Sequence, residues 1–173
     1  MMNASCHETR IPLGHQHEQR NDNLCVRLAF NDGVLIRMQM EEGPVEELTP
    51  RRSLPNDYID VGQALSDWNM ESDSRFDWTA HPGFPRVGTA FQRSVWSALC
   101  RVSWGDSVSY GELAQRVGRP DAARAVGRAV GVNPWAPLIP CHRVLAANQG
   151  LGGYAQGTRI KSRLLAIEGT AYR

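Results

Sequence analysis

The chain has 173 residues, 42% of them hydrophobic and 21% charged, which suits a globular protein of one large domain or two small ones. No run of about eighteen apolar residues is present to span a membrane, and the polar N-terminus lacks the apolar stretch of a signal peptide. We therefore expect an intracellular, cytoplasmic protein without a membrane partner. The four cysteines, at positions 6, 25, 100 and 141, form no closely spaced pair, so we expect reduced thiols.

The small net charge of +1 hides an uneven distribution along the chain. Residues 1–87 carry eight basic and fourteen acidic side chains, a net charge of −6, whereas residues 88–173 carry eleven and four, a net charge of +7. The basic half is suited to binding a polyanion such as a nucleic acid, because arginine, its main cation, pairs well with phosphate. The same arginine bias also arises from the codon composition of a GC-rich bacterial genome.

The N-terminal half gives fewer structural signals. Residues 1–23 are polar and irregular, and we expect them to contribute little to the fold. Apolar residues then alternate from Leu24 to Phe30, a turn of Asn31, Asp32 and Gly33 follows, and a second apolar run ends at Met38, which predicts a β-hairpin. Residues 41–87 show no firm period, and residues 81–85 are typical of a linker. We place a domain boundary there, giving domains 1–87 and 88–173.

The C-terminal half begins with two helix signals of the same kind. Thr89 and Gln92 form a capping box for a helix with apolar positions Phe91, Val95, Trp96 and Leu99. Ser109 and Glu112 form a second box for a short helix that ends near Gly118 and Pro120. Asp121 is then expected to cap an alanine-rich helix that ends near Gly131. These two short helices, joined by a tight turn, predict a helix-turn-helix.

The alanine-rich helix has small side chains that allow a close approach to another surface, with Arg124 and Arg128 projecting from it. Two interpretations stay open on the residues alone: the helix enters a DNA groove, or it packs tightly inside the protein.

The segment from Asn133 onward contains the candidate reactive group. Three prolines and an apolar, strand-like run bring Cys141 and His142 to a constrained corner, and a glycine-rich loop follows at residues 150–154. A last helix over about residues 158–168 places Ile160, Leu164, Leu165 and Ile167 on its inner face and ends at Gly169.

A nucleophilic cysteine needs a base or a positive environment that favours its thiolate. His142 adjoins Cys141, and Glu168 is the candidate carboxylate to orient the imidazole, because turns or helix caps account for the other three acids after Gly88. A Cys-His pair alone is also compatible with a purely structural role.

The motifs of residues 88–169 resemble one known family, the methylated-DNA–protein-cysteine methyltransferases, or O6-alkylguanine-DNA alkyltransferases. The resemblance is carried by Ile-Pro-Cys-His-Arg-Val at 139–144, Gly-Thr-x-Phe-Gln at 88–92 with Val95-Trp96, Ser109-Tyr110 with Leu113-Ala114, Ala-Arg-Ala-Val at 123–126, Asn133-Pro134, Gly153-Tyr154, and Leu164-Leu165 with Glu168-Gly169. It implies an α+β fold: a small ribonuclease-H-like α/β domain, then a mostly helical, winged-helix-like domain containing the helix-turn-helix.

The resemblance also implies a role for individual residues. Cys141 would accept the alkyl group once and irreversibly from O6-alkylguanine, with O4-alkylthymine as a further substrate. His142 would take the thiol proton through a water and Glu168 would hold His142. Tyr110 would rotate the nucleotide and donate a proton to guanine N3, and Asn133 would be a hinge. The implied base contacts come from Tyr110, Cys141, Val144, Tyr154 and Ala155.

The implied partner is double-stranded DNA containing the damaged base. A monomer would bind it in the minor groove without sequence specificity, and Arg124 would fill the gap left by a flipped nucleotide. The residues that the resemblance assigns to DNA contact are Ala122, Ala123, Arg124, Gly127 and Arg128. No cofactor is implied for the chemistry.

The sequence departs from the family pattern at two positions. Gln156 stands where a glycine or a large aromatic is common, so we expect altered tolerance for bulky adducts. Arg163 replaces a common tryptophan, which we expect to change packing more than chemistry. A structural zinc on Cys6, His7, His15, His17 and Cys25 is one interpretation of the N-terminus, and a solvated polar tail is the other. Cys100 is expected to be a buried apolar residue, and Trp135 suits either the core or the pocket rim.

Three other functions remain open. A non-catalytic alkyltransferase-like protein would sense damaged DNA, although such proteins replace the acceptor cysteine that Cys141 supplies here. A helix-turn-helix transcription factor would bind specific sequences, and a cysteine hydrolase would turn over repeatedly.

Overall fold

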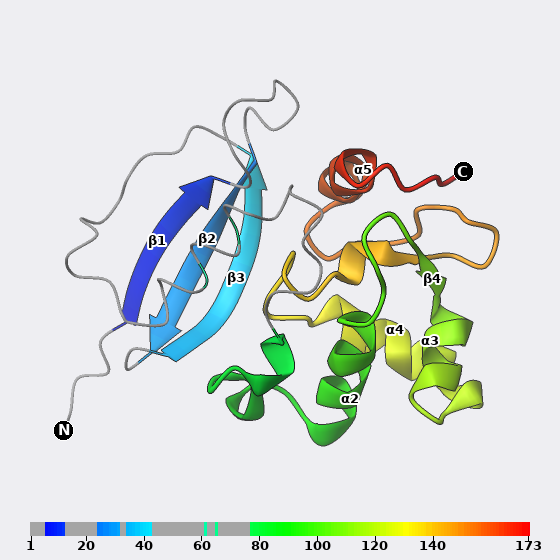
Figure 1. Ribbon diagram of the computed structural model, residues 1–173, viewed down its shortest axis with the longest axis horizontal. Helices are drawn as coiled ribbons and strands as arrows, with labels where there is room; N and C mark the ends of the chain where they lie inside the picture. The colour runs from blue at the N-terminus through cyan, green and yellow to red at the C-terminus, as the bar shows by residue number, and fades with distance from the viewer. Residues whose placement is uncertain (1–5, 13–23, 32–33, 43–60, 62–64, 66–76) are drawn as a thin grey trace.

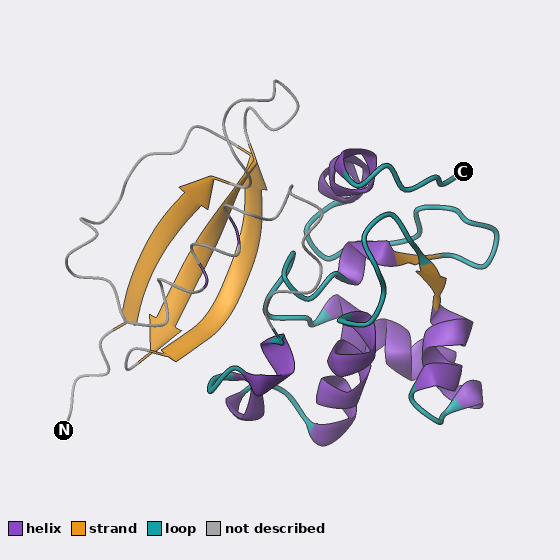
Figure 2. Ribbon diagram, viewed as in Figure 1, coloured by secondary structure: helices purple, strands orange, loops and turns teal. Residues whose placement is uncertain are grey.

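The protein is an α+β structure in which a three-stranded sheet lies beside a layer of helices (Figure 1). The computed structural model describes residues 6–12, 24–31, 34–42, 61, 65 and 77–173. Figure 2 shows the three long strands gathered on one side and the helices on the other. Among the described residues, no helix has the length and apolar character needed to cross a lipid bilayer.

The sheet contains β1 (Cys6–Pro12), β2 (Leu24–Asn31) and β3 (Val34–Glu42), paired antiparallel in the order β1-β2-β3. The predicted hairpin is therefore confirmed as β2 and β3, with its Asp32-Gly33 tip outside the described residues. Apolar side chains of β2 and β3 point into the core, among them Val26, Leu28 and Phe30 of β2 and Met38 and Met40 of β3, at alternate positions as the pleat requires. The expectation that residues 1–23 are irregular is wrong for β1. These residues form a strand because their backbone pairs with β2, and the polar sequence of β1 does not indicate that pairing.

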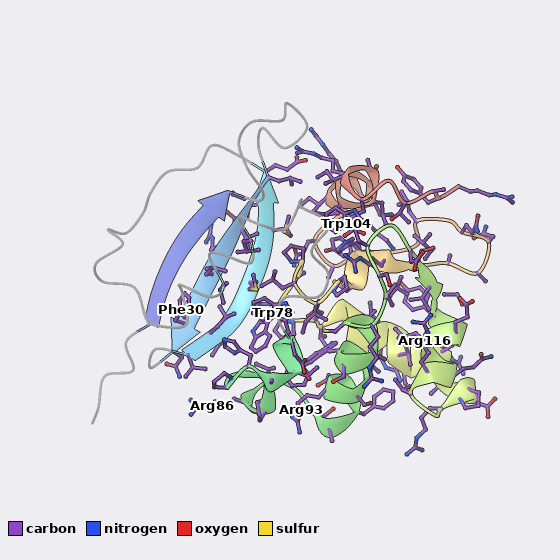
Figure 3. All side chains as sticks on the ribbon, viewed as in Figure 1. Phe30, Trp78, Arg86, Arg93, Trp104 and Arg116 are labelled. Atoms are coloured by element: carbon purple, nitrogen blue, oxygen red, sulfur yellow. The ribbon has the colours of Figure 1, made fainter. Side chains whose placement is uncertain are left out.

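The segment before the first long helix is packed rather than exposed, which corrects its interpretation as a linker. It forms two 3-10 helices, Trp78–Ala80 and Phe84–Arg86, and the side chains of His81 and Phe84 are buried. Both rings contact Trp135, with centroids 5.0 Å and 5.9 Å away. Figure 3 shows Trp78 on this segment, between the sheet and α2. Trp135 is fully buried, so it belongs to the core.

Helix α2 (Ala90–Leu99) starts at the predicted capping box, in which Thr89 and Gln92 bond each other's backbone N–H groups. It buries Val95, Trp96 and Leu99, as predicted. Gly88 precedes it with a φ of +63°, and a Cβ there would lie 2.5 Å from the Trp96 ring, so glycine is required at this entry turn.

The helix-turn-helix consists of α3 (Tyr110–Arg116) and α4 (Ala123–Gly131), joined through a 3-10 turn at Pro120–Ala122. The second capping box, Ser109 with Glu112, is confirmed. The prediction that Asp121 caps α4 is wrong: Asp121 lies within the 3-10 turn, and Ala122 occupies the N-cap position without a side-chain bond. Trp96 Nε1 donates to Ala129 O at 2.9 Å, which joins α2 to α4.

The chain then passes through the reactive segment. Instead of a strand before Cys141, the structure has a 3-10 helix at Cys141–Arg143, followed by β5 (Val144–Leu145), which pairs in parallel with β4 (Val108–Ser109). The strand-like pattern there reflects burial of most of the segment, with Trp135, Ala136 and Ile139 fully buried. Helix α5 (Thr158–Ile167) ends as predicted at Gly169, whose φ is +70°.

Candidate active site

A cavity of about 200 Å³ opens beside α4 and contains Cys141 in its wall. The lining residues come from α3, α4, the reactive segment and the glycine-rich loop: Tyr110, Gly127, Val130, Gly131, Asn133, Cys141, Gly153, Tyr154, Ala155 and Gln156. The structure thus brings together five of the residues predicted for chemistry and substrate binding. The other three, His142, Val144 and Glu168, are buried outside this lining.

Cys141 is held at the start of its 3-10 helix by a shared backbone acceptor. The carbonyl oxygen of Ile139 accepts from Cys141 N at 2.8 Å and from Asn133 Nδ2 at 2.7 Å. The other amide atom of Asn133, Oδ1, accepts from Trp135 N at 3.1 Å. Asn133 therefore ties the end of α4 to the turn that carries the thiol, and its role as a hinge stays a prediction.

The thiol of Cys141 is nearly inaccessible, with 6% of the residue exposed. Burial raises the pKa of Cys141, while hydrogen bonds with Asn133 and Tyr154 and the charge of Lys161 act in the opposite direction. Sγ donates to the Tyr154 hydroxyl over 3.8 Å. Because the raised pKa keeps the resting group as a thiol, any nucleophilic reaction has to begin with loss of its proton.

Behind the cysteine, a buried ionic cluster surrounds Glu168. Its Oε1 lies 2.8 Å from His142 Nε2 and 2.9 Å from Arg143 Nη2, and Arg143 Nε donates to Oε2 at 3.0 Å. Burial raises the pKa of Glu168, but His142 and Arg143 outweigh that effect and the pKa is lowered. The predicted pairing of His142 with Glu168 is present, and the carboxylate is ionised.

Arg143 was not among the predicted site residues. Besides Glu168 it bonds the carbonyl oxygen of Val102, and its guanidinium lies 5.8 Å from the centroid of the Trp104 ring. The sequence feature that could have indicated a role for Arg143 is its position as a charged residue within an apolar run, because a charge buried there would need a partner.

Lys161, the one lysine of the chain, was also missed. It is fully buried on the inner face of α5, and its Nζ donates to the carbonyl oxygens of Val144, at 2.5 Å, and Leu151. Burial lowers the pKa of Lys161 to about 8, although the charge of Cys141 works against this. The signal was its spacing: Lys161 stands three and four residues before the buried Leu164 and Leu165, on the stripe that should be apolar.

Two phenols line the cavity, Tyr110 and Tyr154. Burial is the main cause that raises the pKa of each, and the charge of Cys141 adds to it. Both are therefore protonated at neutral pH and able to donate. Gly127 of α4 lies against the Tyr110 ring, at a distance where a Cβ would be in ordinary van der Waals contact, 3.7 Å from two ring carbons.

Helix α4 has one face packed inside the protein and another that is exposed, so each of the two interpretations of this helix, internal packing and DNA contact, fits one face. Val126, Ala129 and Val130 are buried against the protein, whereas Arg124 and Arg128 are exposed and Ala122, Ala123 and Gly127 are half-buried. The exposed arginines lie on the helix that also lines the cavity. Other arginines, among them Arg86 and Arg116 labelled in Figure 3, are exposed elsewhere on the helical part.

The zinc interpretation conflicts with the register of the sheet. Cys6 pairs with Asn31 and Cys25 pairs with Pro12, so the two cysteines stand at opposite ends of the β1-β2 ladder, about 20 Å apart at the usual rise per residue. One ion cannot bind both. His15 and His17 lie outside the described residues. Cys100 is half-buried at the end of α2, and burial raises its pKa to about 12.

Comparison with known proteins places this site in a family. The sequence model described as "6-O-methylguanine DNA methyltransferase, DNA binding domain" matches residues 90–170. The methylated-DNA–protein-cysteine methyltransferase of Mycobacterium tuberculosis is 51% identical over 150 residues, covering 82% of this chain and 84% of the relative. That of Methanosarcina mazei is 40% identical over 121 residues, covering 68% and 77%. The chain belongs to the methylated-DNA–protein-cysteine methyltransferase family.

Solved structures agree with this assignment. The crystal structure of Mycobacterium tuberculosis O6-methylguanine methyltransferase superposes with a TM-score of 0.62 at 31% identity, covering 95% of this chain and 93% of that one. The Mycobacterium tuberculosis OGT crystallised in complex with DNA gives 0.57 at 34% identity, covering 84% and 86%.

Proposed function

We propose that this protein repairs DNA directly, by moving the alkyl group from O6 of guanine, or O4 of thymine, onto Cys141. The observation that carries the proposal is that Cys141 lines a cavity together with residues of the helix-turn-helix, while the next residue, His142, is paired with the buried Glu168. The names of the relatives, and the DNA bound by a solved neighbour, support it. The damage-sensing alternative is not favoured, because Cys141 is present.

The proposed reaction balances with protein groups alone. Sγ of Cys141 forms a bond to the alkyl carbon as the bond from that carbon to O6 breaks, and the electron pair returns to the purine. The thiol proton leaves toward His142 through a water, and the phenol of Tyr110 supplies a proton to guanine N3. Solvent then carries the proton from the imidazolium back to the Tyr110 phenolate, so that both protein groups end neutral. No cofactor takes part in this scheme. The product is a thioether, so each molecule reacts once.

Glu168 favours the proton transfer through its charge. An ionised carboxylate beside His142 stabilises the imidazolium that forms when the histidine takes the thiol proton, and it fixes the ring's orientation. Lys161 adds a positive charge that stabilises the thiolate. These groups offset the burial that keeps Cys141 protonated at rest.

The proposed partner is a duplex bound in its minor groove, without sequence specificity, by a cytoplasmic monomer. The small residues Ala122, Ala123 and Gly127 would allow close approach to the DNA backbone, and Arg124, which is exposed on the same helix, would enter the base stack. The target base must leave the stack to reach the cavity, and a poorly paired alkylguanine is extruded more easily.

The proposed role of Ala155 is to donate its backbone N–H to O6, with the carbonyl oxygens of Cys141 and Val144 accepting from the guanine amino group. Val144 O already accepts from Lys161, so a second donor would have to use its other lone pair. The division into domains 1–87 and 88–173, and the ribonuclease-H-like and winged-helix descriptions, stay predictions.

The proposal is tested by the intact mass of the protein after incubation with a duplex carrying one O6-methylguanine. We expect a gain of one methyl group and no more, absent from the Cys141→Ala variant. DNA binding without any gain in mass would instead identify a damage sensor.

A further inference from the structure

Trp135 is a core residue that stands two positions after the cavity-lining residue Asn133. Its indole is enclosed by the segment that precedes α2. The His81 ring meets it edge to face, with centroids 5.0 Å apart, and the Phe84 ring lies 5.9 Å away. A Cβ on Gly83 would lie 3.1 Å from Cζ2 of the indole, so that side is closely filled as well. We call His81, Gly83 and Phe84 the socket of Trp135.

The backbone beside Trp135 is joined to the sheet. Met38 N donates to Pro134 O at 2.6 Å, and Met38 and Trp135 form a parallel bridge. Because the sheet order is β1-β2-β3, this bond uses the edge of β3 that faces away from β2. Figure 1 shows the segment after α4, drawn in yellow, beside β3. Trp135 is therefore held through its side chain by the socket and through its backbone by β3.

Both backbone polar groups of Trp135 bond to the reactive segment. Trp135 N donates to Asn133 Oδ1 at 3.1 Å, and Trp135 O accepts from Ile139 N at 2.9 Å. Asn133 Nδ2 donates to Ile139 O at 2.7 Å, which closes a loop of three hydrogen bonds. The same oxygen of Ile139 accepts from Cys141 N, so the loop sets the position of the residue that carries the thiol.

The proposed transfer depends on this position in two ways. Attack on the alkyl carbon requires an aligned thiolate, and a misplacement of about 1 Å can slow such a reaction by about a hundredfold. Burial raises the pKa of Cys141, and its hydrogen bond with Asn133 lowers that pKa. A shift of Asn133 would therefore misplace the thiol and also make its proton harder to remove.

We infer that Trp135 is a positioning residue for the proposed transfer, because its packed indole fixes the hydrogen-bond loop of Asn133 and Ile139 that places Cys141. This inference rests on the proposed function. The indole is fully buried outside the cavity lining, so it acts through Asn133 and not on the reacting atoms. The aromatic socket before α2 thereby takes part in the chemistry of a cavity that it does not line.

The test measures single-turnover methyl transfer from a duplex carrying O6-methylguanine. Trp135→Leu removes the ring and keeps an apolar side chain, whereas Trp135→Phe keeps an aromatic ring. Phe84→Leu loosens the socket and leaves Trp135 in place, so it tests the inference even if Trp135→Leu does not fold. Leu24→Ala is the matched control, because Leu24 is also buried and pairs with Glu42, four positions along β3 from Met38.

Two further measurements separate positioning from a general loss of stability. The pH profile of Cys141 labelling by a small alkylating reagent reports on the thiol, and the affinity for an undamaged duplex reports on α4. The ionisable groups around the thiol are the same in every variant: Tyr110 of α3, Tyr154 of the glycine-rich loop, Lys161 of α5, and the cluster of His142, Arg143 and Glu168. A shifted profile therefore reports on the hydrogen bond from Asn133.

We expect transfer to slow by about tenfold or more in Trp135→Leu and by about threefold in Phe84→Leu. In both variants labelling should move to higher pH, while duplex affinity stays within about twofold of the wild type because the arginines of α4 are unchanged. Trp135→Phe should restore the transfer rate to within about twofold, and Leu24→Ala should leave the rate and the pH profile like those of the wild type.

Transfer rates and labelling profiles that match Leu24→Ala in Phe84→Leu, and in Trp135→Leu where it folds, would overturn the inference and leave the proposed function standing. A loss of duplex affinity as large as the loss of rate would also overturn it, because the effect would then lie in α4. Failure of the wild type to become methylated would overturn the proposed function and the inference with it.

Discussion

Nε2 of His142 lies 2.8 Å from Oε1 of Glu168, and neither side chain is exposed to solvent. The same carboxylate also binds Arg143, so one acid neutralises a buried guanidinium and orients a buried imidazole. A single residue therefore serves both the stability of the core and the proposed proton transfer.

Replacement of Glu168 should show both roles. In Glu168→Gln the Arg143 guanidinium stays buried without a counter-charge, so we expect the free energy of unfolding to fall by about 3 kcal/mol. Urea denaturation measures this change. Glu112→Gln is the control, because glutamine keeps the exposed capping box and should change stability by less than about 0.5 kcal/mol. A loss in Glu168→Gln no larger than that of the control would mean that Arg143 finds another partner.

The lowered pKa of Glu168 predicts a pH dependence of stability. The folded protein binds the Glu168 proton less tightly than the unfolded chain, whose carboxyl has the ordinary pKa of 4.5. The corresponding stabilisation is complete above that value and is lost as the pH falls through the folded pKa. Between about pH 5 and about pH 3 the wild type should therefore lose more stability than Glu168→Gln, as measured by thermal melting. Parallel curves for the two proteins would contradict this assignment.

Lys161 should affect both the fold and the thiol. Lys161→Met removes the donor to two carbonyl oxygens, and we expect a loss of about 2 kcal/mol in unfolding free energy. It also removes the charge that lowers the pKa of Cys141, so labelling of Cys141 by a small alkylating reagent at neutral pH should become slower.

Arg159→Met is the control for Lys161→Met, since this cation lies on the same helix with 82% of its side chain exposed. It should leave both the stability and the labelling rate nearly unchanged. Equal labelling rates in wild type and Lys161→Met would show that the lysine has only a structural role.

Arg124 allows binding of DNA to be separated from chemistry. Because the side chain is exposed on α4 and remote from the core, Arg124→Ala should keep the stability of the wild type. We expect its transfer rate from a duplex to fall by about tenfold, and its rate with the free base O6-benzylguanine to stay within about twofold. Arg86→Ala removes another exposed charge, from the segment before α2, and should behave like the wild type. Equal losses on duplex and free base would place Arg124 in the chemistry instead.

The sequence by itself determined the features that depend on neighbours a few residues apart. Thr89 with Gln92, and Ser109 with Glu112, set the starts of α2 and α3 through bonds spanning three residues, and Gly169 ends α5 through its own backbone freedom. The β2-β3 hairpin followed from alternation and a short turn. Such interactions need no other part of the chain, so their residue pattern is sufficient to predict them.

Only the tertiary structure decided the contacts between distant segments. The polar strand β1 is ordered by pairing with β2, Lys161 is buried because two carbonyl groups receive its ammonium, and Gln156 bonds a residue 116 positions away. In each case polar groups are buried, and such burial is tolerated only when a hydrogen-bond partner is present. The sequence pattern does not indicate which residue is that partner. The reactive cysteine was predictable from its local motif, whereas the buried cations Arg143 and Lys161 became evident only in the fold.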